Sequence, residues 1–247
     1  MKAFHSEKEL FILSNNKYLF KEKLIQNNLN ITNKLFFSLT NIKIKEKSKI
    51  IYDNLKVQHF NFVNIFSKYY PEELRGILSA PLLLCYKGDI GLLNKKVKRL
   101  VMYNSNKELM KCIEYKSIYD SIKKNKGIIC INNDMKSPKI KVKSVDILSE
   151  EYEYKENINK EDLHILVPKQ FNSLPEVIAS ISDSLLIFSA NYNKEIYRLS
   201  YDMIDFSKEI LVVPGNICNK DYYFSNYLIR EGATVILSYK DIEKIFE

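Results

Sequence analysis

The sequence has only 6 glycines in 247 residues, and none of them belongs to a phosphate-binding motif. Neither Gly-x-Gly-x-x-Gly nor Gly-x-x-x-x-Gly-Lys occurs, and Gly127 precedes an expected strand, whereas a dinucleotide-binding turn follows one. These absences exclude a glycine-built nucleotide cradle, and we predict no cofactor.

Cysteine and histidine are also scarce, with 4 and 3 residues. The cysteines have no partner at the spacing of a zinc knuckle or a redox pair, and no His-x-x-x-His sequence occurs. No Gly-x-Ser-x-Gly elbow is present, and the scattered histidines offer no obvious base to a Ser or Cys nucleophile. We therefore predict no metal site and no catalytic residues, so the chain is not expected to be an enzyme.

Long apolar runs are missing as well. The longest ones are far shorter than the roughly 20 residues that a membrane helix needs. Glu and Lys interrupt the N-terminal stretch where a secretory signal would be apolar. We therefore expect a cytoplasmic protein that makes no membrane contact.

Positive charge is in excess, because 38 Lys and Arg against 30 Asp and Glu give a net charge of +8. A basic balance favours polyanionic partners, nucleic acid first. Part of the excess could instead reflect an AT-rich genome, since the chain is rich in Lys, Asn, Ile and Tyr and has no Trp. A lysine cluster has two interpretations, a phosphate-contacting patch or a solvated helix face: Lys43, Lys45, Lys47 and Lys49.

The pattern of apolar residues predicts two domains. Residues 1–66 have helical spacing between Lys and Asn, which predicts a small N-terminal α-helical domain. Pro71 and Pro81 then mark a shaped connector, and we place the boundary near residue 67. The second domain spans residues 67–247.

Short runs that are apolar on both faces alternate with helical stretches in this second domain, as in a buried parallel sheet. The expected strands are residues 100–103, 128–131, 185–188, 210–213 and 234–237. The expected helices are residues 107–124, 173–181, 195–206 and 222–230. Residues 137–165 are charged and receive no assignment. The predicted fold class is α/β, with a Rossmann-like, doubly wound, mostly parallel sheet.

Polar loops follow the expected strands, and in an open parallel sheet ligands bind beyond the carboxyl ends of the strands. These loops carry Asn104, Ser105, Lys107, Tyr192, Lys194 and Asn216. Amides and hydroxyls hydrogen-bond phosphates or bases, and Tyr192 could stack on a base. The alternative is that asparagine, which is common in this chain, only shapes loops and helix caps.

Several sequence pieces occur in the order found in one family. They are Tyr70-Pro71-x-x-Leu74, Pro81-x-x-Leu84-x-x-x-Gly88, Val212-Val213-Pro214-Gly215 and Asn226-x-Leu228-Ile229-Arg230-Glu231-Gly232-Ala233-Thr234. Together they resemble the DNA-processing protein A (DprA/Smf) family, in a divergent and shortened form. The resemblance implies a cytoplasmic, commonly dimeric protein that binds single-stranded DNA and hands it to a RecA-type recombinase in natural transformation. Such proteins are not enzymes.

The resemblance fails at most of the family's anion-contacting positions. Asn104-Ser105-Asn106 stands where the family has an arginine, and asparagine cannot imitate its bidentate fork. Contacts to DNA would then come from other side chains along the same edge of the sheet. The candidates are Asn104, Ser105, Lys107, Lys169, Tyr192, Lys194, Arg198, Asn216 and Asn226.

Two other functions remain open. The chain could be a non-catalytic protein–protein scaffold that kept the fold after losing DNA binding, with Tyr222, Tyr223 and Tyr227 as interface anchors if they are exposed. A nucleotide enzyme ranks last, because both the phosphate glycines and a catalytic base are missing.

Overall fold

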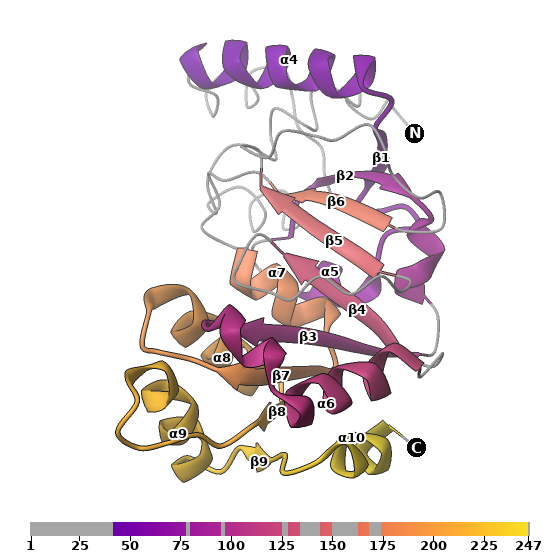
Figure 1. The fold of residues 1–247 in the computed structure, drawn as a ribbon. Helices are drawn as coiled ribbons and strands as arrows, with labels where there is room; N and C mark the ends of the chain where they lie inside the picture. The colour runs from indigo at the N-terminus through magenta and orange to yellow at the C-terminus, as the bar shows by residue number, and fades with distance from the viewer. Residues whose placement is uncertain are drawn as a thin grey trace.

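A sheet of nine strands runs through the part of the chain that the structure describes (Figure 1). The structure is a computed structural model, and it describes residues 42–77, 80–94, 97–124, 128–133, 144–149, 163–167 and 174–246. The strands are β1 (Asn61–Asn64), β2 (Leu83–Gly88), β3 (Lys98–Asn104), β4 (Ile128–Asn133), β5 (Ser144–Ser149), β6 (Leu163–Val167), β7 (Ser184–Ser189), β8 (Glu209–Val212) and β9 (Thr234–Val235).

The strand order is β1-β2-β6-β5-β4-β3-β7-β8-β9, and the seven strands from β6 to β9 in this order are parallel. Only the edge made by β1 and β2 is antiparallel within the described residues. The chain starts the parallel sheet at β3, adds β4, β5 and β6 on one side, and then adds β7, β8 and β9 on the other. The strand order therefore reverses between β3 and β7, which is the switch point where open α/β sheets bind ligands.

Helices cover both faces of the sheet (Figure 1). One core packs α5, α7, α8 and α9 against the sheet, and the opposite face is covered by α6 and α10, with α4 packed on β2 and β6. The bounds are α4 (Ile42–Val57), α5 (Glu72–Gly76), α6 (Ile113–Lys124), α7 (Leu174–Ile181), α8 (Lys194–Asp205), α9 (Tyr223–Arg230) and α10 (Tyr239–Phe246), with 3-10 turns η1 (Ile90–Asn94), η2 (Lys107–Lys111) and η4 (Lys220–Tyr222). No described helix is long and apolar enough to cross a bilayer.

The predicted α/β, mostly parallel sheet is confirmed. Leu100, Val101 and Met102 of β3 are completely buried, so both faces of this strand are covered, as the apolar run predicts. The expected strand at residues 234–237 is shorter, because only Thr234 and Val235 pair with β8. Gly232 follows α9 at φ +104, the left-handed conformation of a helix stop.

Four strands correct or complete the sequence prediction. β2 lies inside the segment interpreted as a connector, and β5 and β6 lie in or at the end of the unassigned residues 137–165. β1 lies before the expected boundary at residue 67, yet it pairs with β2 and its Val63 packs in the main core. The helical character expected for residues 1–66 thus holds for α4 and is wrong for β1. The two-domain division stays a prediction, and residues 1–41 lie outside the described residues.

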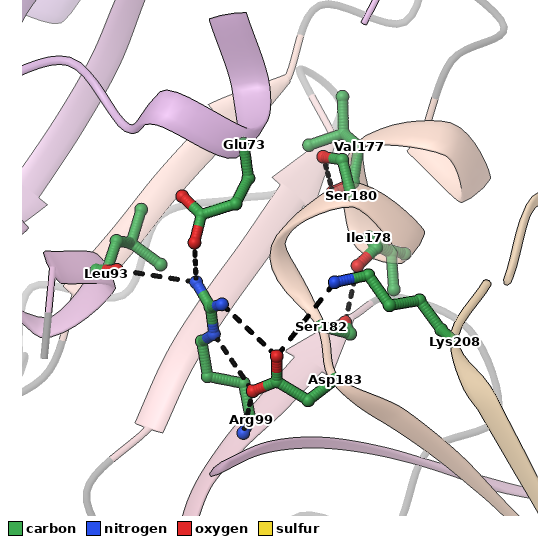
Figure 2. A network of polar contacts seen from close by, with 9 residues as sticks. All are labelled: Glu73, Leu93, Arg99, Val177, Ile178, Ser180, Ser182, Asp183 and Lys208. Carbon is green, nitrogen blue, oxygen red and sulfur yellow. Dashed lines mark hydrogen bonds and ion pairs between the residues drawn. The ribbon is translucent and has the colours of Figure 1, made fainter. Parts of the chain in front are cut away.

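A buried ionic network joins the elements at the amino ends of β3 and β7 (Figure 2). The Arg99 guanidinium donates to both carboxylate oxygens of Asp183 at 3.3 Å, and its Nη1 lies 2.9 Å from Glu73 Oε1. Asp183 also accepts the backbone N–H of Arg99 at 2.8 Å, and Lys208 Nζ lies 4.0 Å from its carboxylate. This network lies at the edge of the sheet opposite to the switch point and fixes β3 against the turn before β7.

Candidate nucleic-acid interface

The switch point between β3 and β7 is closed by hydrogen bonds within the chain. Ser189 ends β7, and its hydroxyl donates to Asn104 Oδ1 at 2.9 Å. Ser105 Oγ lies 3.0 Å from Ser189 Oγ, and the Ser105 backbone N–H donates to the Ser189 carbonyl. Asn104 is only 5% exposed. The polar side chains that the sequence places at this edge therefore bond first to one another.

A second loop lies across the same edge. Asn106 Nδ2 donates to Asp221 Oδ2 at 2.7 Å, which joins the loop after β3 to η4. The hydroxyls of Tyr115 on α6 and Tyr222 in η4 lie 3.2 Å apart and link η4 to this helix as well. Burial, followed by this hydrogen bond, raises the pKa of Tyr115, so its phenol stays protonated. The carboxylate of Asp221 thus lies at the switch point.

The loop after β8 is held by two asparagines. Asn226 Nδ2 donates to the Gly215 carbonyl at 3.0 Å, and its Oδ1 accepts the Gly215 N–H at 3.2 Å. Asn216 is exposed, and its Oδ1 accepts the backbone N–H of Cys218 at 2.8 Å. Both residues shape the loop, as the alternative interpretation of the asparagines expects.

The loop between β7 and α8 offers more exposed groups. Asn193 caps α8 by accepting the backbone N–H groups of Glu195 and Ile196, each at 3.0 Å. Lys194 is exposed at the first position of the helix, and Tyr192 is 63% exposed. These two side chains are oriented so that an outside ligand can reach them.

Arg198, one turn along α8, already has an acidic neighbour. Its Nε lies 3.9 Å from Asp202 Oδ2, an oxygen that makes no hydrogen bond to the described residues. Burial raises the pKa of Asp202 to about 6, against the lowering effect of Arg198. A phosphate that binds Arg198 would therefore compete with a poorly solvated carboxylate.

The chain has a DprA-like fold. The structure of DNA processing protein A from Streptococcus pneumoniae matches with a TM-score of 0.72 at 17% identity, covering 100% of this chain and 99% of that one. The same protein from Helicobacter pylori, which binds single-stranded DNA, matches with a TM-score of 0.59 at 14% identity, covering 77% of this chain and 99% of that one. No family model matches the sequence, and no curated protein matches it either.

On this DprA-like fold, the structure brings most of the predicted site residues to one edge of the sheet. Asn104, Ser105, Asn216 and Asn226 make intramolecular hydrogen bonds there, whereas Tyr192 and Lys194 face solvent. Lys107 begins η2 directly after the β3 loop. Lys169 lies outside the described residues.

An aromatic row on α8 and α9 was not predicted as a unit. Tyr192 packs on Tyr197 with ring centroids 5.3 Å apart, and Tyr197 packs on Tyr201 at 4.4 Å. The rings of Phe224 and Tyr227 on α9 continue the row, with their centroids 5.9 Å apart. A hydrogen bond to Tyr201, followed by desolvation, raises the pKa of Tyr197. The i, i+4 spacing of Tyr197 and Tyr201 was the signal available in the sequence.

Charge is divided unevenly among the described residues. Residues 97–124 contain seven Lys and Arg against three Asp and Glu, a net +4. Residues 174–246 contain seven against ten, a net −3. Residues 42–77 contain seven against four, a net +3, so the basic character that favours a polyanion is shared by this segment and by β3, η2 and α6, where the exposed lysines are Lys111, Lys116, Lys123 and Lys124. Among the described residues, no three metal-ligating side chains are grouped to hold an ion.

Proposed function

We propose that this protein binds single-stranded DNA in the manner of the DprA/Smf family and is not an enzyme. The observation that carries the proposal is a DprA-like fold over the whole chain, whose polar loops meet at the switch point between β3 and β7. The net charge of +8 supports a polyanionic partner. The proposal extends to a cytoplasmic homodimer that passes DNA to a RecA-type recombinase in natural transformation, as the family resemblance implies.

The exposed side chains define the proposed contacts. Lys194 would contact a phosphate, and the ring of Tyr192 would stack on a base, a contact worth about 1–3 kcal/mol per base. Lys107 and Lys169 are proposed as further phosphate contacts. Arg198 would join them only after leaving Asp202. Four further residues would support the loops of the interface: Asn104, Ser105, Asn216 and Asn226. They would contact DNA only through polar atoms that make no hydrogen bond within the chain.

A titration of a fluorescent 20-nucleotide single strand at several salt concentrations tests this function. We expect binding at low salt, with log K falling against log salt by about 0.7 for each phosphate contacted. Tyr192→Ala should weaken binding about fivefold or more, whereas Tyr239→Ala on α10, which removes an exposed ring that is not a proposed contact, should not. Absence of binding at low salt would refute the proposal.

The second candidate is the protein–protein scaffold, and two observations favour it. The polar groups at the switch point bond to each other, and residues 174–246 are net acidic. Tyr223 is 49% exposed and could anchor a partner, whereas Tyr222 is 6% exposed and is part of the core. Light scattering and a pull-down with a RecA-type recombinase, both performed without DNA, separate this function from the first.

A further inference from the structure

The edge of the sheet at the switch point already holds a carboxylate that belongs to the chain. We propose that the Asp221 carboxylate excludes phosphate from this edge and so determines which part of the surface a polyanion can use. The claim about phosphate stands on the geometry alone, and its extension to DNA rests on the function proposed above.

The donor that faces Asp221 is rigidly held. The Asn106 backbone N–H donates to Asn104 Oδ1 at 3.1 Å and to Ser189 Oγ at 3.2 Å. Asn106 Oδ1 accepts the backbone N–H of Glu108 at 3.0 Å, which assigns the other end of the amide as the Nδ2 group. That group donates to Asp221 Oδ2 at 2.7 Å.

Asp221 is held from its own side as well. Asn219 Oδ1 accepts the Asp221 backbone N–H at 3.0 Å and begins η4. The next residue, Tyr222, packs its ring so closely on Gly215 that a Cβ there would overlap it. These contacts keep the carboxylate at the switch point without help from a ligand.

A phosphate that accepted a hydrogen bond from Asn106 Nδ2 would lie beside this carboxylate. Two negative charges a few ångströms apart in a partly buried site repel each other strongly enough to weaken binding by about tenfold or more. Lys220, the residue before Asp221 in η4, is exposed and would otherwise attract an anion. One carboxylate therefore cancels the attraction at the place where the fold would bind an anion.

Asp221→Asn tests the inference because asparagine keeps an oxygen acceptor for Asn106 and removes only the charge. The probe is inorganic phosphate, and the readout is the NMR shift of the Ser105 and Asn106 amides. We expect the variant to show a saturable shift at a phosphate concentration about tenfold lower than the wild type. Glu209→Gln is the matched control, because it removes the same charge at the amino end of β8. Equal phosphate responses in wild type and Asp221→Asn would overturn the inference.

A DNA titration separates the inference from the proposed function. If DNA binds, Asp221→Asn should bind more tightly at low salt, and its salt slope should be steeper by about 0.7, the value for one added phosphate. If neither protein binds DNA while the variant alone binds phosphate, the inference holds and the DNA-binding function is refuted. If both bind DNA with the same slope and neither binds phosphate at the amides, the inference is refuted and the DNA-binding function holds.

Discussion

Removing the Asp183 carboxylate should destabilise this protein more than most single changes. Asp183→Ala deletes three hydrogen-bond acceptor contacts to Arg99, at 2.8, 3.3 and 3.3 Å. The Arg99 side chain is only 9% exposed, so the guanidinium cannot recover its lost partner from water. Breaking a buried pair by removing one partner costs about 3–5 kcal/mol.

Two features place the expected loss near the lower end of that range. Glu73 remains 2.9 Å from the Arg99 guanidinium, and the Asp183 side chain is itself 26% exposed. We therefore expect Asp183→Ala to lower the free energy of unfolding by about 3 kcal/mol, which corresponds to a fall in Tm of about 6–12 °C. Asp183→Asn, which keeps one oxygen for the Arg99 backbone N–H, should lose less, about 1–2 kcal/mol.

Equilibrium urea unfolding followed by far-UV circular dichroism measures these losses. The exposed Asp205 on α8 provides the control, because Asp205→Ala should change stability by no more than about 0.5 kcal/mol. The double variant Arg99→Met/Asp183→Leu removes the buried charge together with its partner and should recover part of the loss. The reasoning is wrong if Asp183→Ala costs less than about 1 kcal/mol, or if the double variant is no more stable than Asp183→Ala.

Three further changes test other parts of the fold. The pKa of Asp202 is raised to about 6 in the folded state, so the unfolded chain releases this proton at a lower pH. The free energy of unfolding should therefore fall as the pH rises from about 4 to about 6. Asp202→Asn should flatten this fall in a series of urea-unfolding experiments and add about 1 kcal/mol of stability at pH 7, after allowance for solvent screening. Ser189→Ala should cost about 1 kcal/mol by the same measurement, because Asn104 Oδ1 loses one of its two donors and keeps the Asn106 backbone N–H. Gly215→Ala should cost about 1–3 kcal/mol in thermal unfolding, because its methyl group would overlap the Tyr222 ring; an unchanged Tm would contradict that packing.

The sequence predicts the parallel centre of the sheet because burial on both faces leaves a local signature. Leu185, Leu186 and Ile187 of β7 are all completely buried, as an apolar run without alternation predicts. β2 carries a comparable apolar run at residues 82–86, but Pro81 precedes it and favours the interpretation as a connector; its pairing with β6 depends on residues far along the chain. Asp146 interrupts the apolar run of β5, so β5 is recognisable only beside β4 and β6.

The candidate site also contains some contacts that the sequence predicts and others that it does not. Asn193 and Asn216 form local caps and turns, which their residue type predicts. The contact between Asn106 and Asp221 joins residues 115 positions apart, and nothing in either loop indicates it. Tyr197 and Tyr201 could be paired from their spacing, whereas their approach to Tyr227 requires the packing of α8 beside α9.

The closed switch point and the uneven charge together limit how a polyanion can approach. Attraction comes from the exposed Lys111, Lys116, Lys123 and Lys124 of η2 and α6 and from the net positive residues 42–77, whereas residues 174–246 repel a polyanion through their net negative charge. Asp221 belongs to this acidic segment and accepts a hydrogen bond from Asn106 of the basic residues 97–124, so the two segments meet at a border at the switch point. A DNA strand bound to this chain would therefore lie along the lysine-bearing side and reach Tyr192 and Lys194 only by passing over this border. Since each phosphate held by a lysine adds to the salt dependence and a stacked base does not, a salt slope of only one or two phosphates would place the strand mainly on the aromatic side.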